Sequence, residues 1–327
     1  MKKNQYYFNF VLLHLILLAI FLLQSCDKNK ITILTKEVKD VNQISAKCTG
    51  QVSDNEKIIE KGFCWDTLSS PTIDHYKLKV ESNSTTYSGI IRPLKSLKTY
   101  YIRAYAMTES SVFYGNMIQI TTLNNTFVDP RDGRNYKMIT IGTQTWMAEN
   151  LNTIKYNDGT DIPQVTNPSS WNYIETPAYC WYENNQELFG ETYGPLYNWY
   201  SVNTGKLCPL GWHVPSDSEW STLVNYCGGD QIAGNKLKEI KNFHWSYPNT
   251  GADNESGFTA LPGGFRDYNG DFITVNLLGY WWCSSEGGDW CAWYRYMHKD
   301  FSNVIRVNEN KKRGLSVRCV KDENLIQ

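Results

Sequence analysis

The sequence predicts a mainly β chain in which an N-terminal β-sandwich is followed by a module that mixes strands with helix. Before residue 123, apolar and polar residues alternate in several short segments, as they do in half-buried strands. Eleven of the twelve tryptophans lie between Trp146 and Trp293, and only Trp65 precedes residue 140, so the two halves differ in composition. The segment TTLNNTFVDPRDG between them is rich in Asn, Pro, Asp and Gly, which is typical of a loop.

The N-terminus has the pattern of a secretory signal peptide. Lys2 and Lys3 precede an apolar run from Phe8 to Leu23, which is shorter than the roughly 20 residues needed to cross a bilayer. The run ends in the letters LQSC, which resemble the bacterial lipobox, where the peptide is cleaved before a cysteine that becomes acylated. We therefore expect residues 1–25 to be a lipoprotein signal peptide, residues 26–31 to be a short tether, and Cys26 to carry lipid, palmitate included. An uncleaved anchor or an ordinary signal peptide is the alternative.

A lipid anchor would place the chain in the bacterial cell envelope, on the outer membrane, facing either the periplasm or the cell surface. Thiols tend to oxidise in such a compartment. With Cys26 set aside, eight of the nine cysteines remain, an even number that allows up to four disulfides. These candidates are Cys48, Cys64, Cys180, Cys208, Cys227, Cys283, Cys291 and Cys319. The formal charge of −1, with both signs mixed, gives no electrostatic reason to expect nucleic acid as a partner.

Residues 32–123 are predicted to form the β-sandwich. One strand face carries Ile44, Ala46 and Cys48, and another carries Tyr100, Ile102, Ala104 and Ala106, with Arg103 and Tyr105 on the opposite side. The run LKSLKTYYIRAYA followed by SSVFYGNMIQITTL resembles the last strands of a fibronectin type III-like domain. Leu94 and Tyr100 best fit the leucine and the tyrosine that close a corner between the sheets of that family. Cys48 and Cys64 are expected either to form a disulfide or to remain two buried thiols.

Residues 126–322 form the second predicted module, and residues 323–327 are a tail. A strand over residues 136–141, a turn at Gly142 and a return strand at Trp146 open the module. A helix should start near Ser216, because Ser216 can cap it and acidic residues fill its first turn. Gly228 and Gly229 should end that helix.

Several long blocks of this module occur together in one known family. They are DGRNYKMITIGTQTWMAENLN, YGPLYNWYSV, CPLGWHVPSDSEW and GFTALPGGFRDYNG, followed by WWCSS and SVRCV. In this order they resemble the Fibrobacter succinogenes major paralogous domain, a module of bacterial surface lipoproteins. That family is similar to the formylglycine-generating-enzyme type of the C-type lectin-like fold. The resemblance implies an α+β domain of short antiparallel strands, one or two helices and long loops.

The same resemblance implies a role for some cysteines. Lectin-like folds often join the region before the helix to the last strand, which here would pair Cys208 with Cys319, although Cys227 competes for the same partner. Formylglycine-generating enzymes carry two cysteines that bind copper and oxidise a substrate cysteine, and CSSEGGDWCAWYRY lies at the corresponding place. Cys283 and Cys291 are eight positions apart rather than about five, and no Cys-x-x-Cys pattern supports a metal site.

We therefore expect no metal or cofactor, and we expect Cys283 and Cys291 to be joined across a β-hairpin whose turn is Glu286-Gly287-Gly288-Asp289. A copper oxidase using these two cysteines, or bridges to other cysteines, are the alternatives. Hydrolysis is not favoured, because acidic residues beside glycines mostly form solvated turns and no G-x-S-x-G motif occurs. The chain is thus not expected to be an enzyme.

Noncovalent binding is the remaining class. Tryptophan stacks on sugar rings, and charged side chains hydrogen-bond hydroxyl groups. The candidate ligand-binding residues are Trp290, Glu286, Asp289, Trp293, Arg266 and Asp267, with Trp281 and Trp282 considered beside them. Many of these rings must instead fill the core, and Trp290, beside the glycine turn, is the best candidate for exposure. The sequence thus predicts a lipid-anchored envelope protein whose sandwich is a spacer and whose second domain binds a glycan or surface protein. A structural or adhesive component without a small ligand is the alternative.

Overall fold

The computed structural model describes residues 31–53 and 58–323. The expected signal peptide and the acylated Cys26 lie outside these residues. The structure is mainly β, with 38% strand and 12% helix arranged in several small sheets. None of the described helices combines the length and the apolar composition that crossing a membrane requires.

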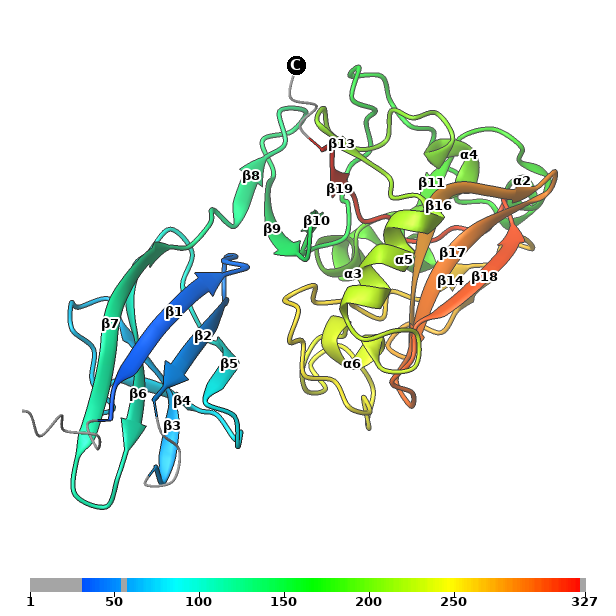
Figure 1. Cartoon of the computed structure of the whole chain (residues 1–327). Helices are drawn as coiled ribbons and strands as arrows, with labels where there is room; N and C mark the ends of the chain where they lie inside the picture. The colour runs from blue at the N-terminus through cyan, green and yellow to red at the C-terminus, as the bar shows by residue number, and fades with distance from the viewer. Residues whose placement is uncertain (1–30, 54–57, 324–327) are drawn as a thin grey trace, which may run out of the picture. The chain divides into compact units, whose positions relative to one another are not determined.

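The described residues divide into two compact units (Figure 1). The first comprises the chain up to Lys39, Lys47–Ile91 and Thr99–Ile120, and the second comprises Asp40–Ala46, Arg92–Lys98 and the chain from Thr121 onward. The strands from the N-terminus to Thr121 are β1 (Ile33–Lys39), β2 (Ala46–Val52), β3 (Glu60–Asp66), β4 (Tyr76–Lys79), β5 (Thr86–Ile91), β6 (Thr99–Met107) and β7 (Val112–Thr121).

Two sheets build the first unit, one in the order β1-β2-β5 and one in the order β4-β3-β6-β7. The rings of Phe63 on β3 and Tyr87 on β5 lie 5.3 Å apart, so apolar side chains of the two sheets meet. The predicted alternation is present, since Ala46 and Cys48 on β2 are buried, as are Ile102 and Ala104 on β6.

Tyr105 is an exception to that alternation. It was expected on the outer face of β6, yet it is fully buried. Its hydroxyl donates to Glu60 Oε1 at 2.7 Å, and this hydrogen bond satisfies the one polar atom of the buried side chain. Because Glu60 on the neighbouring strand β3 accepts this hydrogen bond, the Tyr105 side chain can be buried.

Cys48 and Cys64 are free buried thiols, which was the second of the two expected outcomes. Cys48 lies on β2 of one sheet and Cys64 on β3 of the other. The Cys64 thiol donates to the carbonyl oxygens of Pro71 (3.5 Å) and Arg103 (3.6 Å). No disulfide joins the two, and the Cys64 thiol already has hydrogen-bond partners.

The second unit contains short strands and short helices. Its strands are β8 (Thr126–Val128), β9 (Asn135–Ile141), β10 (Gln144–Met147), β11 (Tyr179–Cys180), β12 (Leu196–Tyr197), β13 (Trp212–His213), β14 (Phe265–Arg266), β15 (Phe272–Ile273), β16 (Leu278–Gly288), β17 (Cys291–His298), β18 (Ile305–Asn310) and β19 (Val320–Lys321). Its helices are α2 (Pro168–Tyr173), the 3-10 helix η1 (Tyr182–Asn184), α3 (Gln186–Tyr193), α4 (Trp199–Val202), α5 (Asp217–Tyr226) and α6 (Ala233–Leu237).

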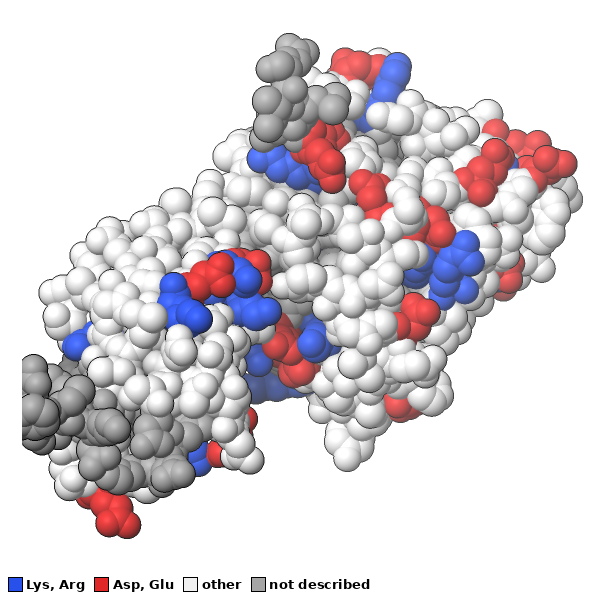
Figure 2. Space-filling model, viewed as in Figure 1, with Lys and Arg blue, Asp and Glu red and all other residues white. Residues whose placement is uncertain are grey.

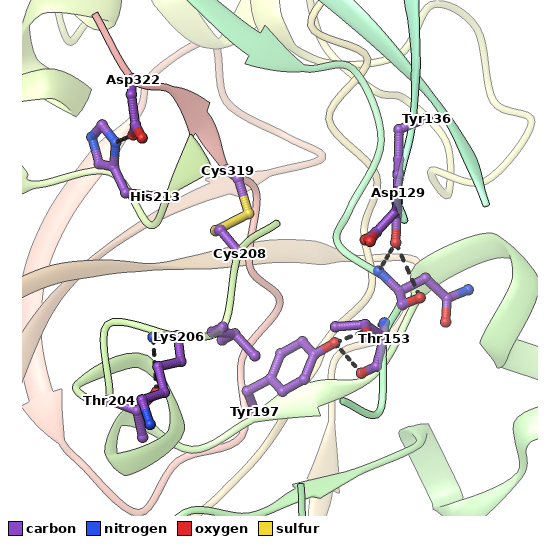
Figure 3. Close-up of a disulfide and its surroundings, with 12 residues drawn as sticks. Asp129, Tyr136, Thr153, Tyr197, Thr204, Lys206, Cys208, His213, Cys319 and Asp322 are labelled. Atoms are coloured by element: carbon purple, nitrogen blue, oxygen red, sulfur yellow. Dashed lines mark hydrogen bonds and ion pairs between the residues drawn. A yellow bond between two sulfur atoms is a disulfide. The ribbon is translucent and has the colours of Figure 1, made fainter. Parts of the chain in front are cut away.

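A five-stranded sheet in the order β13-β19-β10-β9-β8 brings the two ends of this unit together. The predicted hairpin of β9 and β10 is present, and Gly142 adopts a φ of +63° in its turn. The last strand, β19, pairs with both β10 and β13. The disulfide Cys208–Cys319 ties the segment before β13 to the segment before β19, as Figure 3 shows.

Helix α5 begins where the sequence predicts. Ser216 caps it in a full capping box, in which the Ser216 hydroxyl and the Glu219 carboxylate each accept from the other's backbone N–H. Its inner face buries Trp220, Leu223 and Val224. The chain leaves the helix through Gly228 and Gly229, whose φ angles of +105° and +92° favour glycine.

The sheet β16-β17-β18 is covered on both faces over much of its length. Trp281 and Cys283 on β16 join a core cluster that includes Trp220 of α5. Trp282 of the same strand, with its side chain on the opposite face, joins a second cluster together with Tyr294 of β17. Trp281 and Trp282 are both fully buried, so these two rings are core residues rather than ligand-binding residues.

Candidate functional site

The hairpin of β16 and β17 has a different turn from the one predicted. The expected turn was Glu286-Gly287-Gly288-Asp289, but β16 continues through Gly288 and the strands connect at Asp289 and Trp290. The pairing register shifts twice along this end of β16, so the glycines form an irregular, bulged strand rather than a turn. A Cβ at Gly287 would lie 2.9 Å from the Cβ of Asn308, which explains why glycine is needed there.

Trp290 projects from this turn and is 67% exposed. Glu286 and Asp289 beside it are also exposed, so three of the predicted binding residues lie together at the end of the hairpin. The Trp290 ring therefore remains available to a ligand, and carboxylates flank it.

Lys311, which follows β18, fixes the backbone of this turn. Its ammonium group pairs with the Glu286 carboxylate and donates to the Asp289 carbonyl oxygen at 2.8 Å, and its backbone N–H donates to the Trp290 carbonyl oxygen at 3.1 Å. The same ammonium group lies 4.9 Å from the ring centroid of Trp199, and Lys311 is only 5% exposed. The turn is thus held in one position, which lowers the entropy that Trp290 would lose on binding.

The ring of Trp293 stacks with the guanidinium group of Arg306. The Arg306 guanidinium carbon lies 3.5 Å from its ring centroid. Arg306 Nε donates to Asp217 Oδ1 at 2.9 Å, and Arg295 Nη1 donates to the same oxygen at 2.7 Å. Burial disfavours the Asp217 carboxylate, but these two hydrogen bonds outweigh burial and lower its pKa. Trp293 is therefore part of a charged cluster that joins β17, β18 and α5.

Arg266 does not face a ligand. It is fully buried, and its guanidinium donates to the carbonyl oxygens of Gly270 (3.0 Å), Val165 (2.7 Å) and Thr166 (2.8 Å). The rings of Trp171 and Phe272 lie 4.5 and 4.9 Å from its guanidinium carbon. The expectation that Arg266 binds ligand is corrected: it ties loops of the core together.

Asp267 forms an ion pair within the protein. It accepts from Arg313 Nε at 2.9 Å, and its side chain is only 16% exposed. Asp267 is thus a mostly buried ion-pair partner, whereas the Glu286 side chain remains 58% exposed although it pairs with Lys311. Asp289 and Trp290 are exposed as well.

The expected disulfide between Cys283 and Cys291 is not formed, and both are free buried thiols. The register explains this, because Cys291 pairs with Gly288 whereas Trp282, beside Cys283, pairs with Tyr294. The two cysteines are therefore not cross-strand neighbours. Burial raises the pKa of the Cys283 thiol to about 12, so this sulfur is protonated at neutral pH.

The other cysteines of this unit are also accounted for. Cys180 and Cys227 are free and buried, and the competing bond from Cys227 is not formed because Cys319 pairs with Cys208.

Within residues 31–53 and 58–323, no three His, Cys, Asp or Glu side chains are grouped in a way that could hold a metal ion. Charges of both signs are interspersed over the face that Figure 2 presents.

Sequence reasoning missed Lys311, Arg306 and Asp217. Asp217 was assigned only to the first turn of the helix, and the two cations lie on or after a strand that was not predicted. Their contacts depend on the register of β17 with β18, in which Cys291 pairs with Asn310. No spacing in the sequence reports that register, so no local signal could have identified these residues.

Comparisons with known proteins identify the second unit by sequence. The family described as the Fibrobacter succinogenes major domain matches residues 139–321, more than half of the chain. A search of curated proteins found no match.

Two of the similar solved structures cover less than a third of this chain. The solution structure of the sensor domain of the anti-sigma factor RsgI4 from Pseudobacteroides cellulosolvens has 17% identity and a TM-score of 0.23, and covers 29% of this chain and 76% of that one. A structure titled "Myokine structure" has 16% identity and a TM-score of 0.23, and covers 28% of this chain and 97% of that one. Scores this low carry no conclusion about the present chain.

Proposed function

The chain belongs to the Fibrobacter succinogenes major domain family, and on that premise we propose that it is a lipid-anchored protein of the bacterial cell envelope that binds a glycan or a protein without catalysing a reaction. The ligand-binding part is the second unit, for which we propose a C-type lectin-like fold. The first unit is a spacer that holds the second unit away from the membrane.

The anchor rests on the sequence of the first 26 residues, where a basic start and an apolar run lead to Cys26. Acyl chains contribute roughly 0.8 kcal/mol per buried methylene, so a multiply acylated Cys26 would hold the chain on a membrane. Replacing Cys26 with alanine should abolish labelling by a palmitate analogue and release the protein from the membrane fraction. Unchanged labelling and retention would contradict the anchor.

A fibronectin type III-like fold for the first unit is supported by its two sheets of three and four strands. Tyr100 on β6, which fits the family's corner tyrosine, is buried. For the second unit, a lectin-like fold is supported by its short strands, its capped helix α5 and the disulfide that joins the segment before this helix to the end of the domain.

The observation that carries the binding proposal is the exposure of Trp290. A ring that is 67% exposed on a turn of fixed position buries little of its surface in the fold and offers a large apolar surface to a partner. Glu286 and Asp289 supply hydrogen-bond acceptors beside it. Such an arrangement suits recognition of sugar rings or of an apolar pocket on a protein.

The test compares the wild-type chain with Trp290→Ala on a glycan array and on immobilised surface extracts of the cells that the bacterium meets. Tyr173→Ala is the matched control, because Tyr173 is an 80% exposed aromatic residue outside the hairpin. We expect Trp290→Ala to reduce binding at least tenfold and Tyr173→Ala to leave binding unchanged. Equal binding of all three proteins would exclude the hairpin, and no binding to either surface would favour a structural component.

A further inference from the structure

We propose that a second site, a cleft in the second unit centred on Arg134, Asn152, Trp181 and Gln186, binds a neutral saccharide. None of these four residues belongs to the β16–β17 hairpin, so this inference is independent of the role proposed for Trp290.

Two adjoining hollows form the cleft, with volumes of about 450 and 280 Å³. Both are lined by Arg134, Asn152, Trp181 and Gln186, so they meet at these residues. Ligand pockets in proteins range over roughly 300–1,000 Å³. The combined space is therefore in the range that a small organic ligand requires.

Segments distant in the sequence build the walls. Arg134 lies in the turn between β8 and β9, and Asn152 lies in the extended segment after β10. Trp181 immediately precedes the 3-10 helix η1, and Gln186 is the first residue of α3. Because regular strands and a capped helix hold these segments, the cleft is part of the folded domain rather than a surface loop.

Trp181 lies along the wall of the cleft, with its ring almost fully buried in the core. Its ring packs on Gly190 of α3, where a Cβ would lie 3.3 Å from two ring atoms and 3.0 Å from Gln186 Cγ. Glycine inside a helix is destabilising relative to alanine, and this close approach explains its presence. The ring is 4% exposed.

Uncommitted polar groups lie at the rim. The side chains of Gln186 and Glu187 are exposed, and neither has a hydrogen-bond or ion-pair partner among residues 31–53 and 58–323. Asn152 Nδ2 donates to the Gly190 carbonyl oxygen at 2.8 Å, which fixes the amide, while its Oδ1 has no donor in the same ranges. The cleft thus combines a fixed acceptor with two adaptable side chains, as sites for hydroxyl-rich ligands do.

The charges around the cleft favour a neutral ligand over an anion. Each cation that lines it is paired with a carboxylate: Arg131 with Asp129 (2.7 Å), Arg134 with Glu191 (2.5 Å) and Lys155 with Asp161 (2.6 Å). An anionic ligand would have to compete with these carboxylates for the same donors. A neutral sugar needs only hydroxyl contacts to the side-chain amides and to the Glu187 carboxylate along the cleft.

The test measures binding of neutral hexasaccharides of glucose, mannose, xylose and N-acetylglucosamine to the full chain by titration calorimetry, in a detergent without a sugar headgroup. Gln186→Ala combined with Glu187→Gln removes two rim groups that have no partner in the part of the chain that the structure describes. Leu188→Ala is the matched control, because Leu188 is 64% exposed on the same helix and does not line the cleft. Hexagalacturonate is the anionic comparison.

We expect at least one neutral hexasaccharide to bind, the double variant to lose affinity at least tenfold, and Leu188→Ala and Trp290→Ala to retain it. Hexagalacturonate should not bind. The proposal is overturned if none of the four neutral probes binds, if the double variant binds as the wild type does, or if hexagalacturonate binds as well as the neutral sugars. Loss of binding on Trp290→Ala with full binding by the double variant would instead assign the sugar to the hairpin.

Discussion

Removal of the disulfide Cys208–Cys319 should cost the second unit a large part of its stability. The bond closes a chain segment with a sequence separation of 111 residues. In the chain-entropy model, a cross-link over a loop of this length stabilises the folded state by about 5 kcal/mol at 25 °C, since it restricts the unfolded chain. Domains of this size are stable by only about 5–15 kcal/mol, so the double variant Cys208→Ala/Cys319→Ala should be close to the limit of folding.

Urea unfolding followed by tryptophan fluorescence is a suitable assay, because eleven of the twelve tryptophans lie between Trp146 and Trp293 and report on this unit. With an m-value of about 2–3 kcal/mol per molar urea, the midpoint should fall by about 2 M. The wild-type protein in reducing buffer is the control and should unfold with the double variant. A midpoint within about 0.3 M of the oxidised wild type would refute the view that this bond constrains the unit.

Three further predictions concern stability. His213 lies between two carboxylates, Glu219 at 2.7 Å and Asp322 at 2.5 Å, and Figure 3 shows it with Asp322. The hydrogen bond to Glu219 raises the pKa of His213 to about 9; burial opposes this shift, and the hydrogen bond to Asp322 adds to it. Because the pKa of His213 in the folded state exceeds the usual value of 6.5, the stabilisation that protonated His213 provides is complete below pH 6.5 and is lost as the pH rises through 9. A urea midpoint that stays level from pH 6 to 10, or that falls equally in His213→Gln, would contradict this prediction. Ser216→Ala removes the cap of α5 and should lower the free energy of unfolding by about 1 kcal/mol in the same urea assay, with Ser218→Ala as a control inside the helix. Arg266→Ala removes a fully buried guanidinium that donates to three carbonyl oxygens, one buried and two part-buried, and should cost about 3 kcal/mol. A loss below about 1 kcal/mol would mean that Arg266 is not a structural residue.

Local signals in the sequence predicted local structure well. Ser216 and Glu219 marked the start of α5 because a capping box needs only residues three positions apart. Gly142 marked the turn between β9 and β10 for a similar reason, since the positive φ of that position favours glycine. Alternating residues in β2 and β6 likewise predicted most of the side chains that are buried in the sandwich, with Tyr105 as the exception.

Predictions that depended on register or on distant partners were less successful. The Cys283–Cys291 bond was inferred from a turn at the glycines, but the bulged pairing of β16 moves the turn to Asp289 and Trp290. Arg266 was taken for a surface group, yet its acceptors include Val165 and Thr166, about a hundred residues earlier. Such contacts are set by the packing of whole segments, and a single sequence carries no local record of them.

Binding by the chain before and after Trp290→Ala tests the central claim most directly, because that ring is the exposed group on which the proposed function rests. Surface plasmon resonance with the best ligand from the glycan array or the surface extracts should give at least a tenfold rise in Kd for Trp290→Ala. Tyr173→Ala should match the wild type. A Kd for Trp290→Ala equal to that of the wild type would contradict the account and leave the hairpin without a role in recognition.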